Sequence, residues 1–127
     1  MADNGIRVGR VSSIDYASGM IKVVYTDKDN SVTRSIPYLN MNGEYKMPNI
    51  DDMVLVLHLS NGSAMAIVAG TFWNEANKPV EGGKGLFRKE LGREPGEAYF
   101  RYDSDKKELS IKADVIKFLT PNETITY

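Results

Sequence analysis

The residues from Met53 to Leu59 form a nearly continuous apolar run that ends shortly before an Asn61-Gly62 pair. Such a run predicts a strand that is buried on both faces. Asn-Gly is the strongest short-range signal of a hairpin, because a type I′ turn requires positive φ at both central positions. The sequence therefore predicts two antiparallel strands joined by this turn, Met53–Leu59 and Ser63–Thr71.

Other short runs alternate apolar and polar residues with a period of two, and no helical period is present. Gly9 lies inside the first of these runs and predicts a bulge or a sharp bend. Ile21, Val23 and Tyr25 share one face of the second run, and Pro37 follows the third. The strands predicted before the hairpin are Ile6–Asp15, Met20–Thr26 and Ser31–Ile36.

The fold class predicted is therefore all-β. Five strands in this order match a five-stranded OB-fold barrel, which is a Greek-key arrangement. A small β-sandwich would share much of the pattern, but we favour the barrel. Residues 38–52 are predicted to be irregular, where many OB folds carry a helix. The OB-fold domain is predicted over residues 1–79, followed by a linker over residues 80–97 that contains Gly82-Gly83 and Pro95-Gly96.

Alternating strands return in residues 98–127, which we predict as a C-terminal segment of its own. A lone ribbon of this size is marginal in water, because it covers one face of its own apolar surface at most. The barrel and other copies of the chain are both candidates to cover it. The large and small apolar residues expected on the uncovered surface are Phe100, Tyr102, Leu109, Ile111, Ala113, Val115, Ile116 and Phe118.

Composition argues against catalysis. The chain has no Cys, and its single histidine, His58, has no neighbouring motif that supplies an acid–base partner. Asp51-Asp52 lacks a third ligand at metal-binding spacing, so we predict a turn there. No Gly-x-Ser-x-Gly elbow is present. We therefore expect a protein that is not an enzyme and has no catalytic residues, cofactor or metal site.

Single-stranded nucleic-acid binding is the main alternative, because OB folds often stack bases on aromatic side chains in a basic groove. Tyr16, Tyr25, Tyr38 and Tyr45 are candidates for stacking. The chain has 16 basic and 17 acidic residues, interspersed, with a net charge of -1. This balance argues against a surface that binds phosphates.

Several residues carry a resemblance to a known family. Pro48 and Asp52 precede the fourth predicted strand, and Gly70, Phe72 and Asn74 close the fifth. Together with Gly9-Arg10-Val11 and the strand Met20 to Tyr25, these residues resemble the N-terminal OB-fold domain of phage baseplate and tail-spike proteins. Relatives of that kind are the spike and baseplate assembly protein V of contractile-tailed phages and the valine-glycine repeat proteins of type VI secretion. The similarity covers roughly residues 9–79, with Asp51 where Gly is usual.

The resemblance implies a homotrimeric central spike or baseplate protein of a contractile injection machine, beneath the tail hub, that helps to pierce the target envelope. Its C-terminal segment would form a short β-helix or β-prism by trimerisation, with the apolar residues named above at the trimer interface. The expected partners are two further copies, the tail hub protein and a separate spike-tip protein, with no nucleic acid. We expect assembly in the bacterial cytoplasm, no stable membrane insertion before contraction, and release in a virion or a phage-tail-like bacteriocin. A generic secretion adaptor is a third hypothesis.

Overall fold

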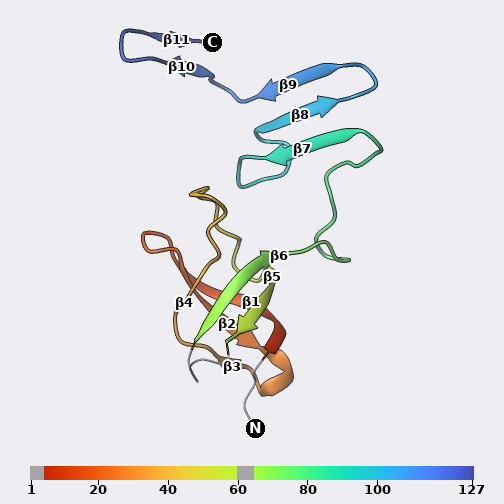
Figure 1. The fold of residues 1–127 in the computed structure, drawn as a ribbon. Helices are drawn as coiled ribbons and strands as arrows, with labels where there is room; N and C mark the ends of the chain where they lie inside the picture. Colours follow the sequence, from red (N-terminus) through yellow and green to blue (C-terminus); the bar gives the residue numbers. More distant parts are fainter. Residues whose placement is uncertain (1–4, 60–64) are drawn as a thin grey trace. The chain divides into compact units, whose positions relative to one another are not determined.

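The computed structural model describes residues 5–59 and 65–127, and their regular structure is β-strand apart from one 3₁₀ turn, Thr26–Lys28 (Figure 1). The prediction of an all-β chain is confirmed for these residues. The chain divides into two compact units, Met1–Asn77 and Lys78–Tyr127.

The first unit is built on one antiparallel sheet with the strand order β3-β2-β1-β5-β6, in which β4 also pairs with β2. The long strand β1 holds the sheet together, because its first half pairs with β5 and its second half pairs with β2. The strands are β1 (Gly5–Asp15), β2 (Met20–Tyr25), β3 (Ser31–Val32), β4 (Ile36–Pro37), β5 (Met53–His58) and β6 (Ala66–Thr71).

The core lies on one face of this sheet. The alternation predicted for β2 is confirmed, since its inward residues Ile21, Val23 and Tyr25 are all buried. Within a single chain the predicted burial of β5 on both faces is wrong, because Val54 and Val56 are buried whereas the alternate residues of β5 are partly exposed. The full set of buried core residues is Val11, Ile21, Val23, Tyr25, Ile36, Val54, Val56, Ala66 and Val68.

The irregularity of β1 differs from the prediction. The shift of register against β2 falls between Val11 and Ser13, so the predicted bulge at Gly9 is wrong. Gly9 is buried and in register with Val54, and a β-carbon there would collide with Val23 Cγ1. The glycine therefore permits a close approach inside the core.

The segment predicted as one strand, Ser31–Ile36, forms two short strands instead. Between them the Thr33 side chain competes with the ladder, because its Oγ1 accepts a hydrogen bond from Val23 N at 3.0 Å. After β4, Tyr38 forms a parallel bridge to Val68, and Leu39 N donates to Val68 O at 2.8 Å. Apart from this bridge, no continuous ladder joins the β3/β4 edge of the sheet to the β6 edge. No closed barrel is found in residues 5–59 and 65–127.

Residues 38–52 contain turns and no helix, as predicted. The turn at Asn49–Asp52 is confirmed, since Asn49 N donates to the Asp52 carboxylate at 2.9 Å and Asp52 N donates to Asn49 O at 3.1 Å. Asp51 has φ of 73°, the left-handed conformation that favours glycine. The predicted Asn61-Gly62 turn lies outside the described residues.

The second unit contains a three-stranded meander and a hairpin (Figure 1). The meander consists of β7 (Leu86–Glu90), β8 (Tyr99–Asp103) and β9 (Glu108–Lys112), and the hairpin of β10 (Lys117–Leu119) and β11 (Thr124–Thr126). Strand β7 lies within residues 80–97, so this interval is more than the predicted linker. Charged residues of this interval form ion pairs with one another and with β8, as described below, and these pairs favour a strand over an irregular linker.

Candidate association surface

One face of the meander is apolar and open to solvent. Phe100 pairs with Ile111 and Tyr102 pairs with Leu109 across β8 and β9. Phe87 pairs with Tyr102 across β7 and β8, so these five side chains share one face, here called the meander face. Phe87 is 58% exposed and Leu109 is 66% exposed, which leaves the meander face largely uncovered by the chain itself.

The opposite face of the meander is polar and internally paired. Glu81 accepts hydrogen bonds from Arg101 Nε at 2.5 Å and from Arg88 Nη1 at 2.9 Å. These bonds from Arg101 and Arg88 lower the pKa of Glu81 to about 2. Arg88 also pairs with Glu90, and its guanidinium lies 3.8 Å from the centre of the Tyr99 ring. The two faces therefore differ in chemistry: one has paired charges, and the other is apolar except for Lys89 on β7.

The C-terminal hairpin repeats this one-sided pattern. Phe118 pairs with Ile125, and the backbones of Ile116 and Tyr127 exchange hydrogen bonds of 3.0 and 2.8 Å. The four side chains share one face, here called the hairpin face, on which the Phe118 and Tyr127 rings meet edge to face at 6.0 Å. Phe118, Ile125 and Tyr127 are exposed. A two-stranded hairpin with an uncovered apolar face is marginal in water and gains stability when a further surface covers it.

The structure brings together six of the eight residues predicted at this surface, on the two faces just defined. Ala113 and Val115 lie in the chain between β9 and β10, outside any strand, because β9 ends at Lys112. Sequence reasoning missed three further members of these faces, Phe87, Ile125 and Tyr127. The signal for the last two was their spacing of two residues, which continues the alternation.

His58 lies in a small polar cluster. Its Nε2 is 2.7 Å from Tyr25 Oη, and the Arg7 guanidinium lies 4.1 Å from the centre of the Tyr25 ring. Arg7 also forms an ion pair with Asp27 at 2.8 Å. In the part of the chain that the structure describes, no three His, Cys, Asp or Glu side chains are grouped to hold a metal.

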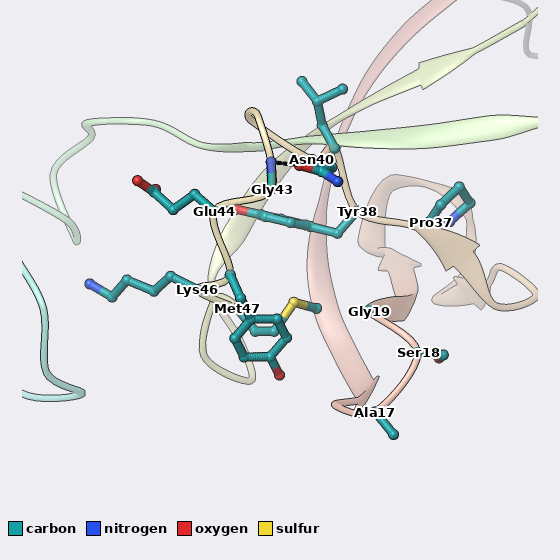
Figure 2. Close-up of a pocket in the computed structure, with 12 residues that line it drawn as sticks. Ala17, Ser18, Gly19, Pro37, Tyr38, Asn40, Gly43, Glu44, Lys46 and Met47 are labelled. Carbon is teal, nitrogen blue, oxygen red and sulfur yellow. Dashed lines mark hydrogen bonds between the residues drawn. The ribbon is translucent and has the colours of Figure 1, made fainter. Parts of the chain in front are cut away.

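A shallow pocket of about 240 Å³ lies between the β1–β2 turn and residues 37–47 (Figure 2). The Tyr38 ring lies across it, while the Glu44 and Lys46 side chains extend away from that ring (Figure 2). Asn40 Oδ1 accepts a hydrogen bond from Gly43 N, which closes the loop of residues 40–43 beside the pocket. Ligand pockets usually measure about 300–1,000 Å³. Its size therefore does not favour a cofactor site.

The tyrosines considered for base stacking do not form a common platform. Tyr25 is 5% exposed and belongs to the core, so its selection as a stacking residue was wrong. Tyr38 is half-buried, and burial together with the nearby Asp52 charge raises its pKa. Tyr16 and Tyr45 are exposed, and Tyr45 Oη donates to Tyr16 O at 2.9 Å.

Residues 5–59 and 65–127 include no helix with the length and apolar content needed to cross a bilayer. In comparisons with known proteins, the chain matches no family model and has no significant match among curated proteins.

Proposed function

We propose that the chain is a non-enzymatic, homotrimeric spike or baseplate protein of a contractile injection machine. The observation that carries the proposal is the pair of open apolar faces in Lys78–Tyr127, the meander face and the hairpin face. Threefold association would bury both faces in three copies at once and leave the Glu81 network toward solvent. The protein would lie below the tail hub, and the short spike formed in this way would help to pierce the target envelope.

The proposed OB barrel of the first unit is supported by its pairing order. β1 pairs with both β2 and β5, β5 pairs with β6, and the Tyr38–Val68 bridge joins the chain just after β4 to β6. A five-stranded Greek-key barrel needs these neighbours. The turn before β5 supports the resemblance, since Asp51 adopts the left-handed conformation at the position where the spike proteins usually have Gly.

The test is the mass of the full chain in solution by light scattering, with the variant Ile111→Asp. Ile111 is 44% exposed in the single chain, so its burial between copies would contribute about 1 kcal/mol per chain. An aspartate in a closed interface costs about 3 kcal/mol or more per chain, because its charge has no partner there. We expect the wild type to have three times the chain mass of 14.2 kDa and the variant to be monomeric.

The matched control is Ser110→Asp, which places the same charge on the opposite face of β9, paired with Arg101. This control should remain trimeric. A monomeric wild type, or a trimer that survives Ile111→Asp, contradicts the proposal. Tight binding of a single-stranded oligonucleotide that depends on Tyr45 would favour the nucleic-acid hypothesis instead.

A further inference from the structure

The first unit has an open apolar surface of its own, on the face of the sheet opposite the core. Ile6 pairs with Leu57, and Leu57 pairs with Ile67, so three aliphatic side chains form one row across β1, β5 and β6. Val8 and Leu55 pair in the next row. Ile6 is 71% exposed and Val8 is 44% exposed. These five residues are called the outer face below.

The outer face explains the apolar run that begins at Met53. Val54 and Val56 need to be apolar because they lie in the core, but their neighbours Leu55 and Leu57 point to the other side. A strand with one solvated face normally alternates apolar and polar residues. A strand that is apolar on both sides therefore indicates that something covers its second side.

Charged groups lie at the margin of the outer face rather than within it. Arg10 follows Val8 on the same side of β1, pairs with Met53, and donates a hydrogen bond from Nη1 to Asp51 O at 3.3 Å. An apolar centre with depleted charge and a polar rim is the composition of interfaces between protein subunits, above all in homo-oligomers.

The composition of the outer face favours a second copy as its occupant, and the exposed area of the chain is large enough for such a contact. The chain exposes 9406 Å². Two separate compact domains with the sizes of its two units would expose only about 8,100 Å². The excess of about 1,300 Å² is more than the roughly 800 Å² that each partner buries in a stable interface of standard size. The chain therefore has enough surplus surface for an extended contact with copies of itself.

We infer that the outer face of β1, β5 and β6 is a second interface between copies of this chain. For the number of copies this inference rests on the proposed trimer, and it extends the association from the C-terminal unit to the N-terminal unit. Symmetric copies present the same surface, so a single assembly covers the outer face of every chain.

The chain has no Cys, so one introduced thiol reports on one position. We would compare Val8→Cys, on the outer face, with the control Ser31→Cys, an exposed position on β3 of the same sheet. Each full-length variant is treated with a maleimide under native conditions and after denaturation, and its mass is measured by light scattering. Both substitutions are at exposed positions, so the folded chain accommodates them.

We expect trimers in which the thiol of Val8→Cys reacts about tenfold or more slowly than the thiol of Ser31→Cys, because labelling at the outer face then requires transient opening of the interface. Both thiols should react equally after denaturation. A trimer in which the two thiols react at the same native rate overturns this inference and leaves the proposed spike intact. A monomer overturns both, whether the thiol of Val8→Cys reacts or is protected.

Discussion

Gly9→Ala should strongly destabilise the first unit. The added β-carbon would lie 3.0 Å from Tyr25 Cδ1 and Cε1, and closer still to Val23 Cγ1. Carbon atoms in contact normally lie about 3.5–4.0 Å apart. Both neighbours are core side chains, since Val23 is 0% and Tyr25 is 5% exposed. They cannot turn away, because the core around them is closely packed.

Strand β1 cannot withdraw either, because it is paired with β5 at Gly9 and with β2 one residue later, where Arg10 lies opposite Val24. Overpacking costs about 1–3 kcal/mol, and a clash on two sides places Gly9→Ala at the upper end, about 3 kcal/mol. With an m-value of about 1–2 kcal/mol/M for a domain of this size, the urea midpoint should fall by about 1.5–3 M.

The assay is urea unfolding followed by near-ultraviolet circular dichroism at one fixed chain concentration, since association shifts apparent stability. The control is Gly82→Ala, where the added β-carbon has no atom within 4 Å. Val23→Ala removes the atom that is struck first, so the double variant Gly9→Ala/Val23→Ala should lose about 1 kcal/mol less than the sum of the single variants. An unchanged midpoint for Gly9→Ala, or an additive double variant, refutes the reasoning.

Two further predictions concern single residues. The folded pKa of Glu81 lies below its ordinary value of 4.5, at about 2, so its contribution to stability is complete above pH 4.5 and is lost as the pH falls toward 2. Glu81→Gln should therefore reduce the loss of stability between about pH 5 and about pH 2.5, measured by urea unfolding at each pH, and an unchanged pH dependence would contradict the role of the network. Asp51→Gly should raise stability by about 0.5–1 kcal/mol, because glycine adopts the left-handed φ without strain. The same unfolding assay checks it, with a lowered midpoint as the contrary result.

The sequence predicted those parts of the fold that depend on local alternation. The prediction of the inward residues of β2 was correct, because a strand that packs on one side must alternate. The prediction of a turn at Asn49–Asp52 was also correct. The errors at Gly9 and at Ser31–Ile36 have a different origin. The need for glycine at position 9 comes from the close approach of Val23 on β2, and the break within Ser31–Ile36 comes from the hydrogen bond between Val23 and Thr33. The alternation within one segment does not tell how closely a neighbouring strand approaches it.

The candidate surface could also be predicted where it depends on alternation within one strand. Phe100 and Tyr102 alternate within one strand, as do Leu109 and Ile111, and the structure pairs them across β8 and β9. Phe87 was missed because three charged residues follow it in the sequence, Arg88, Lys89 and Glu90. The structure shows that Arg88 and its partner Glu81 lie on the other side of the meander, a separation that becomes visible only when the strands are in register.

The two units use their strands in a common way that argues for association. In the meander, charged side chains pair on one face, and the other face has one charged position, Lys89, on the edge strand β7. In the first unit the core occupies one side of β5, yet the other side has Leu55 and Leu57 rather than polar residues. Exposed apolar side chains in adjacent rows invite aggregation unless they are covered. Each unit thus has an apolar surface with few charged groups, Lys89 in the meander and Arg10 beside the outer face, and the proposed contact between copies would cover both surfaces.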